Sequence, residues 1–66
     1  MDVLGERLRE QRVKQGWTQQ WMADCLKVDR STYTKYERGQ MDPSLGNLCR
    51  LAEILDCSVD WLLGRE

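Results

Sequence analysis

The stretch that decides the fold is residues 18–39, TQQWMADCLKVDRSTYTKYERG. We predict two short helices within it. The first begins after Thr18, whose hydroxyl can accept a hydrogen bond from a free backbone N–H at the start of a helix. Its apolar residues Met22, Ala23 and Leu26 recur at three- and four-residue spacing, which is the period of a helix with one buried face.

The second predicted helix begins after Asp29 and ends at Gly39. Asp29 suits the start of a helix by its shape and its charge, and glycine readily takes the left-handed conformation that closes one. Only Lys27 and Val28 separate the two helices, so their axes must cross at a steep angle. The pattern predicts a helix-turn-helix over about residues 18–38.

The second helix has two chemically different faces, because successive residues turn by about 100°. Tyr33 and Tyr36 fall on one side. The other side carries three cations and two hydroxyls: Arg30, Ser31, Thr34, Lys35 and Arg38. Such groups bind base edges and phosphates in a DNA groove. An ordinary amphipathic helix with a solvated basic face is the alternative that this helix alone leaves open.

The sequence as a whole resembles a known family. The fragments that carry the resemblance are LGERLR at 4–9, GWTQ at 16–19, Ala23, RST at 30–32, YERG at 36–39, PSL at 43–45 and VDWLLG at 59–64. In this order and spacing they are similar to the lambda-repressor-like, or Xre-type (Cro/C1-type), helix-turn-helix family. The resemblance covers nearly the whole chain. It implies an all-α, compact five-helix bundle that binds DNA through its third helix, usually as a dimer on a palindromic operator.

The resemblance and the polar face together predict the contacts to DNA. The residues expected to read bases are Arg30, Ser31, Thr34 and Lys35. The residues expected to hold the DNA backbone are Arg12, Thr18, Gln19, Arg38 and Gln40, the last in a loop whose amides can meet phosphate. In related domains the arginine that matches Arg12 pairs with the glutamate that matches Glu37, so we expect that pair here.

Four residues depart from the family pattern, Gln11, Trp17, Trp21 and Lys27, and the last two leave alternatives open. Lys27 stands where glycine is usual, so either the turn differs or the lysine takes a left-handed conformation with strain. Trp21 stands where a polar residue is usual. It either covers the edge of the core or forms an exposed surface for a partner.

The segments on either side of the motif also read as helices. Residues 2–15 form the first, with Leu4 and Leu8 inward. Asp42 is expected to cap a fourth helix, with Pro43 in its first turn. The predicted core stripe of that helix is Leu45, Leu48, Leu51, Ala52 and Leu55.

The last predicted helix spans Val59 to Leu63 after a cap at Ser58. It carries Trp61, Leu62 and Leu63 on consecutive positions, and so short a helix is not expected to bury all three in its own domain. We therefore predict that these three residues form the interface of a homodimer.

Composition excludes several classes of function. Sixty-six residues with 41% hydrophobic content make one domain, residues 1–66, with one small core. The chain has no histidine, no glycine-rich phosphate loop, and no cysteine or serine with a plausible base, so we expect no enzyme and no cofactor. Its three cysteines lack Cys-x-x-Cys spacing, which predicts no metal site and free, mostly buried thiols.

Charge is unevenly distributed in the sequence. The net charge is −1, but residues 7–38 hold eight lysines or arginines against four acids, whereas residues 39–66 hold two against five. The predicted reading helix therefore lies in the basic part of the chain, as a sequence-specific DNA binder requires. Neither a signal peptide nor a stretch of roughly 20 apolar residues is apparent, so we expect a cytoplasmic protein without a membrane segment.

The leading hypothesis is a sequence-specific regulator of transcription that binds double-stranded DNA, a repressor acting as a dimer on a palindromic operator. The alternative is a protein-interaction module, such as an antitoxin-like partner, that uses Trp21 or Trp61 and binds DNA only secondarily. The polar face discriminates between them, because an interaction module has no need of Arg30, Lys35 and Arg38 together.

Overall fold

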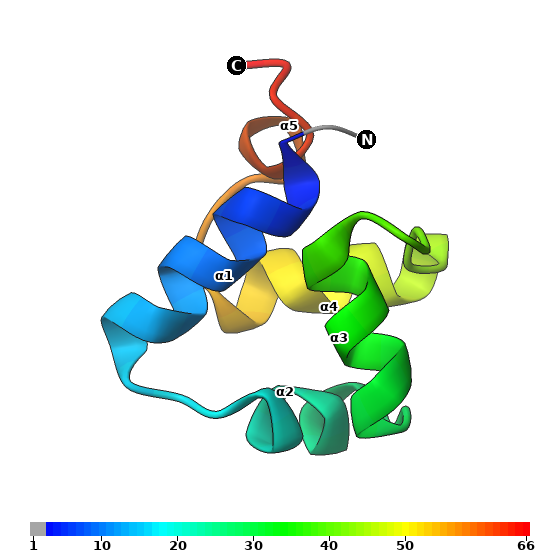
Figure 1. The fold of residues 1–66 in the computed structure, drawn as a ribbon. Helices are drawn as coiled ribbons and strands as arrows, with labels where there is room; N and C mark the ends of the chain where they lie inside the picture. The colour runs from blue at the N-terminus through cyan, green and yellow to red at the C-terminus, as the bar shows by residue number, and fades with distance from the viewer. Residues whose placement is uncertain (1–2) are drawn as a thin grey trace.

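A computed structural model describes residues 3–66, and these form five α-helices. The helices are α1 (Leu4–Gln15), α2 (Gln19–Leu26), α3 (Arg30–Arg38), α4 (Leu45–Ile54) and α5 (Val59–Leu62) (Figure 1). The all-α, five-helix prediction is confirmed, with the helix-turn-helix formed by α2 and α3. The predicted start of the first helix at residue 2 lies outside the described residues. None of the described helices is long and apolar enough to cross a membrane.

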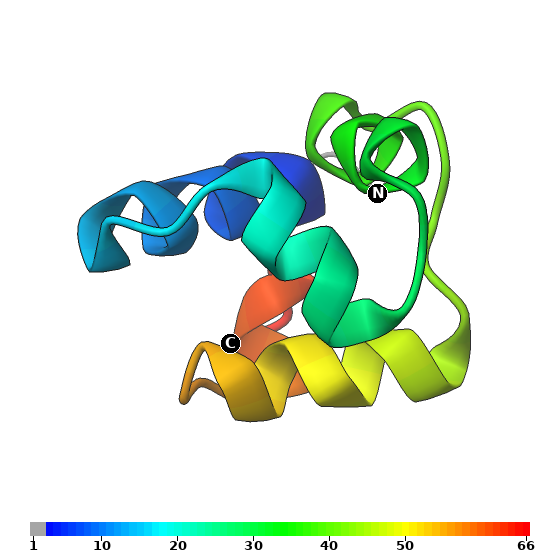
Figure 2. The same cartoon turned by 90° about the horizontal axis from the view of Figure 1, so that it is seen from below.

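The third helix is held by the two helices before it. It packs against both α1 and α2, while α2 also contacts α4, and α5 contacts α1 and α4. Seen from below, α4 lies along one side of the molecule and α3 along the opposite side, with α2 between them (Figure 2). Helix α5 lies beside the start of α1 at one end (Figure 1). This arrangement leaves one long side of α3 free.

The core lies between the five helices, and among residues 3–66 it contains twelve buried apolar residues. They are Leu4, Leu8, Met22, Ala23, Leu26, Tyr33, Tyr36, Leu48, Leu51, Ala52, Leu55 and Leu62. Tyr33 and Tyr36 anchor α3 in this core, with their rings in edge-to-face contact at 6.1 Å between centroids. The predicted division of the third helix into an aromatic inner face and a polar outer face is thus confirmed.

Two predicted helix caps form as expected. The Thr18 hydroxyl accepts from the Trp21 N–H at 3.0 Å, and the Ser58 hydroxyl accepts from the Trp61 N–H at 3.0 Å. Asp29 does stand at the start of α3, but its side chain forms no capping hydrogen bond among the described residues.

The predicted start of the fourth helix is wrong. Ser44, and not Asp42, caps α4, its hydroxyl accepting from the Asn47 N–H at 3.2 Å. Leu45 consequently falls on the first residue of the helix, before its inner face reaches the core, and its side chain is 78% exposed. The predicted core stripe therefore begins at Leu48.

The turn between α2 and α3 keeps a left-handed residue although no glycine is present. Lys27 has φ 58° and ψ 42°, so of the two outcomes expected for it, the strained conformation is the one observed. Its backbone N–H and that of Val28 donate to carbonyls of the last turn of α2, which closes the helix as a glycine would.

Two predictions about burial need correction. Leu62 is fully buried in the core of its own domain, because it lies on the side of α5 that faces the other helices, so it cannot be part of a dimer interface. The thiols are less buried than predicted: Cys25 and Cys57 are half-buried and Cys49 is exposed.

One contact fixes the distance between α1 and α3. Gly5 lies so close to the end of α3 that an added Cβ would stand 2.3 Å from the Glu37 carbonyl oxygen and 2.9 Å from that of Tyr36. Backbone atoms cannot move aside as a flexible side chain can. Gly5 therefore allows the two helices to approach, and the approach sets the position of α3.

We predict that Gly5→Ala destabilises the domain by about 1–3 kcal/mol, the usual cost of forcing extra volume into a packed site. Urea unfolding monitored by circular dichroism measures this. Gly46→Ala is the matched control, because Gly46 also lies in a helix but its added Cβ meets no described atom within 4 Å. That variant should be as stable as the wild type or more stable by up to about 1 kcal/mol. Equal stability of the two variants would contradict the close-approach argument.

Candidate nucleic-acid interface

Two adjacent hollows lie over the helix-turn-helix. The first is lined by Arg12, Trp17, Thr18, Gln19, Gln20 and Arg30. The second is lined by Arg30, Ser31, Thr34, Lys35, Arg38 and Gln40. Arg30 belongs to both, so the hollows join at the start of α3. All nine residues predicted to contact DNA line one hollow or the other, which brings together side chains from α1, α2, α3 and the following loop.

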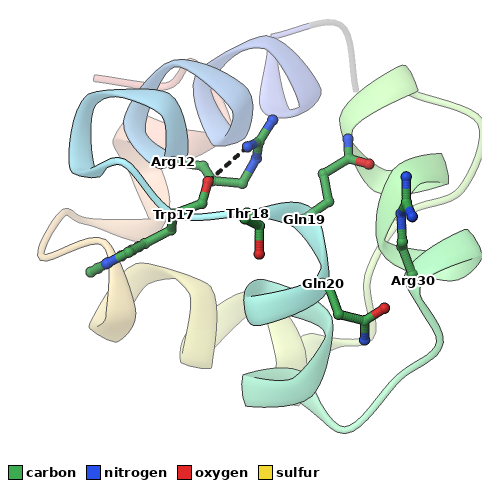
Figure 3. A pocket seen from close by; sticks show the side chains of 6 residues that line it. All are labelled: Arg12, Trp17, Thr18, Gln19, Gln20 and Arg30. Atoms are coloured by element: carbon green, nitrogen blue, oxygen red, sulfur yellow. Dashed lines mark hydrogen bonds between the residues drawn. The ribbon is translucent and has the colours of Figure 1, made fainter.

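Figure 3 shows how the first hollow is assembled. Thr18, Gln19 and Gln20 lie at the start of α2, Arg12 reaches in from α1, and Arg30 faces them from the start of α3. Sequence analysis did not single out Gln20 or Trp17 as site residues. Gln20 was detectable in principle, because it follows Gln19 in the exposed first turn of α2, where side chains and free amides meet an approaching anion.

The second hollow follows the outer face of α3. Arg30, Ser31, Lys35 and Arg38 are exposed, whereas Thr34 is half-buried at the inner edge of the face. We call these five residues the reading face. Because Tyr33 and Tyr36 are buried in the core on the opposite side of the helix, the reading face points away from the core.

The predicted pair of Arg12 and Glu37 is present. Arg12 Nε donates to Glu37 Oε2 at 2.7 Å and Arg12 Nη2 donates to Oε1 at 3.2 Å. This two-point geometry suits a guanidinium and a carboxylate. A third bond, from Arg12 Nη1 to the Trp17 carbonyl oxygen at 2.8 Å, is the dashed line in Figure 3. Arg12 thereby joins α1 to α3 and to the loop before α2.

Gln19 and Thr34 are linked to this pair, a connection that sequence analysis did not predict. Gln19 Nε2 donates to Glu37 Oε1 at 3.1 Å, and the Thr34 hydroxyl donates to Gln19 Oε1 at 2.9 Å. Gln19, expected at the DNA backbone, thus also braces α2 against α3. No spacing rule in the sequence relates residues 19 and 34, because the bond depends on how α2 and α3 cross.

The environment of Glu37 changes its acidity. Its side chain is 3% exposed, and burial alone would raise its pKa. The hydrogen bonds and positive charge of Arg12, with the Tyr33 hydroxyl and the Gln19 amide, outweigh burial and hold the pKa of Glu37 below its usual value. Glu37 in turn raises the pKa of Arg12. The two groups therefore remain an ion pair at neutral pH.

The loop after α3 is partly committed to closing the helix. The backbone N–H of Gln40 donates to the Lys35 carbonyl oxygen at 2.9 Å, next to Gly39 with φ 72°. The backbone N–H of Gln40, one of the groups expected to meet phosphate, is therefore already hydrogen-bonded within the domain. The side chain of Gln40 is exposed and can still contact phosphate.

The two tryptophans near the first hollow stack on each other. The Trp17 and Trp21 rings lie 4.4 Å apart between centroids, tilted by 31°. Trp17 packs against the core, but Trp21 remains 41% exposed. Trp21 therefore extends the core outward without being enclosed by it. Among residues 3–66, no group of three or more cysteine or carboxylate side chains is placed to hold a metal ion.

We predict that the Arg12–Glu37 pair makes the free energy of unfolding fall at acidic pH. Since folding lowers the pKa of Glu37, its contribution is complete above the unfolded value of about 4.3 and is lost as the pH falls through the lower folded value. The wild type should lose more unfolding free energy between pH 6 and pH 3 than Glu37→Gln does. At pH 7 that variant should be roughly 1–3 kcal/mol less stable. Parallel pH curves of the two proteins in urea unfolding would contradict this account.

Comparison with known proteins agrees with the geometry. A family model described as Helix-turn-helix (HTH_3) matches residues 8–62. The chain is 48% identical over 61 residues to the HTH-type transcriptional regulator AnsR of Bacillus subtilis, a match that covers 92% of this chain and 53% of AnsR. It is 42% identical over 62 residues to the cryptic phage CTXphi transcriptional repressor RstR of Vibrio cholerae, covering 94% of this chain and 55% of RstR. The chain thus spans about half the length of these relatives.

Among solved structures, the P22 c2 repressor in complex with the synthetic operator 9T superposes with a TM-score of 0.89. Sequence identity is 31%, and the match covers 97% of both chains. The fold, the motif and the relatives therefore agree: this chain belongs to the helix-turn-helix family of the Xre, or Cro/C1, type.

Proposed function

We propose that the chain is a sequence-specific regulator of transcription, a repressor, that places α3 in the major groove of double-stranded DNA. The observation that carries this proposal is the gathering of all nine predicted DNA contacts in two joined hollows over the helix-turn-helix. Relatives named as transcriptional regulators and a repressor, and a similar structure with an operator, support it. Because its target is DNA, we place the protein in the cytoplasm.

The nine residues have two different roles. Arg30, Ser31, Thr34 and Lys35 lie on the exposed length of α3, which is the part of the motif that meets base edges. The phosphate contacts come from the end of α3, the loop after it, α1 and the start of α2: Arg38, Gln40, Arg12, Thr18 and Gln19. These contacts fix the register of α3 on the duplex. The Thr18 hydroxyl keeps this role while it caps α2, because its oxygen accepts from Trp21 and its proton can still be donated.

We further propose that two copies bind a palindromic operator through contacts at α5. Trp61 and Leu63 are half-buried, whereas Leu62 belongs to the core. One face of the Trp61 ring is covered by Arg7, whose guanidinium carbon lies 4.4 Å from the ring centroid, and Arg7 also donates to the Trp61 carbonyl oxygen. Arg7 therefore holds the indole in one orientation, and the rest of the ring edge is left for a second copy. Two-fold symmetry would place two α3 helices in successive major grooves, about 34 Å apart.

We predict that Arg30→Ala relaxes sequence preference, by about 1–3 kcal/mol at one base pair if Arg30 makes a two-point contact to guanine. Arg38→Ala should instead weaken binding to all sequences alike and reduce the salt slope by about one. Selection of bound sequences from random duplex DNA, followed by titrations at several salt concentrations, measures both. The assignment of Arg30 is wrong if its variant loses affinity while every base preference stays intact.

We predict that Trp61→Glu remains folded, because Arg7 already stands beside the new carboxylate, but binds a full palindrome no better than a half-site. Affinity on both duplexes and the sedimentation of the complexes measure this. Trp21→Glu is the matched control, since it adds the same charge at an exposed tryptophan on α2 and should leave the preference for the palindrome in place. If instead the Trp21 variant alone loses that preference, the interface lies at α2.

A further inference from the structure

Four side chains form one continuous hydrogen-bonded chain from α1 to the reading face. Arg12 donates to Glu37, Gln19 donates to the same carboxylate, and Thr34 donates to Gln19. The last member, Thr34, lines the second hollow beside Arg30, Ser31 and Lys35. The interior of the domain is thus connected to a hydroxyl of the reading face.

The direction of each bond in this chain is fixed by chemistry. A guanidinium only donates and an ionised carboxylate only accepts. Glu37 Oε1 must therefore receive a proton from Gln19, which turns the amide nitrogen of Gln19 toward Glu37. The opposite orientation of the amide would place two oxygens 3.1 Å apart with no proton between them. The amide oxygen of Gln19 consequently faces Thr34, and Thr34 must donate to it.

This direction determines what Thr34 can offer to a base. A hydroxyl has one proton and two lone pairs, and the proton of Thr34 is committed to Gln19. We propose that Thr34 reads DNA as a hydrogen-bond acceptor only, and that it selects the orientation of one base pair by the exocyclic amine of adenine or cytosine. The inference rests on the proposed function and adds to it the kind of base edge that Thr34 recognises.

The major groove offers the required contrast. Adenine and cytosine present an amine donor there, whereas thymine and guanine present carbonyl acceptors at the corresponding place. An acceptor-only hydroxyl can bond the amines and faces the carbonyls with a lone pair, which leaves both groups unsatisfied. Inverting the base pair exchanges amine for carbonyl at Thr34, so the inversion should be disfavoured.

The first step of the test locates the base pair. Sequences are selected from random duplex DNA with the wild type and with Thr34→Val, which has the same shape but lacks the hydroxyl. One base pair should lose its preference in the variant. Inverting it should weaken wild-type binding by about three- to tenfold, the usual range for one hydrogen bond, and Thr34→Val binding by little. Thr32→Val, the same substitution at a half-buried position of α3 that lines neither hollow, should keep the wild-type preference.

The second step identifies the group that is read. At the located base pair, adenine is replaced by 2-aminopurine, or cytosine by 2-pyrimidinone, each of which lacks the amine in the major groove. Wild-type affinity should fall by about three- to tenfold, whereas the affinity of Thr34→Val should not change. In Gln19→Leu the Thr34 proton is released and can be donated to a carbonyl, so inverting the base pair should cost that variant less than the wild type.

The outcomes separate this inference from the proposed function. If the wild type selects no sequence at all, both are overturned. If it selects a sequence but Thr34→Val keeps every preference, or if removing the amine leaves wild-type binding unchanged, only the acceptor role of Thr34 is overturned. An equal cost of inversion in Gln19→Leu and in the wild type would show that Gln19 does not set the direction of the Thr34 hydroxyl.

Discussion

The carboxylate of Glu37 is the group on which the arrangement of the motif depends. A buried charge is costly unless it is paired and hydrogen-bonded, and Glu37 has partners from two other helices, Arg12 on α1 and Gln19 on α2. The carboxylate can be satisfied only when α1, α2 and α3 stand at one set of distances and angles. The close backbone approach at Gly5 acts on the same helix pair. The hydrogen bonds of Arg12 to Glu37 and the steric contact at Gly5 therefore both constrain α3 relative to α1.

This constraint concerns orientation more than stability. Apolar packing around Tyr33 and Tyr36 would tolerate small rotations of α3, since apolar contacts have no preferred direction. Charged hydrogen bonds are directional and tolerate much less. The core holds α3 to the domain, and the hydrogen bonds of Glu37 fix which of its side chains are exposed. The hydrogen bonds inside the domain therefore determine which groups can contact DNA.

Much of the fold could be predicted because its signals are local. The apolar spacing of α2, the hydroxyl of Thr18 and the opposed faces of α3 each depend on residues within one or two helical turns. The errors arose where a local signal had two readings. Asp42 and Ser44 are both good caps, and only the path of the chain from α3 decides between them. Trp61, Leu62 and Leu63 are alike in hydropathy, and only the position of α5 against α1 and α4 decides that Leu62 is buried.

Most residues of the candidate site could be predicted from the sequence, but the hydrogen bonds that Gln19 makes between α2 and α3 could not. Its residues could be named because α3 has a period and because the chain resembles a family with known contacts. The pair of Arg12 and Glu37 followed from the resemblance, and from the acid that an unpaired Glu37 would place beside the DNA-binding face. The bond between Gln19 and Thr34 could not be predicted, because it crosses between helices whose relative angle is set by packing that no short stretch of sequence encodes.

The turn at Lys27 bears on how much sequence change the domain can absorb. Lys27 and Asp56 both hold positive φ, at 58° and 53°, and for a residue other than glycine this costs on the order of 1 kcal/mol, less for aspartate than for lysine. A domain of this size has a net stability of only a few kcal/mol, at roughly 0.05–0.15 kcal/mol per residue. Strain of this size reduces the free energy of unfolding that further destabilising substitutions can consume before the domain unfolds. Glycine at position 27 would relieve part of the strain, so we expect evolution to accept it more readily than most substitutions in the core.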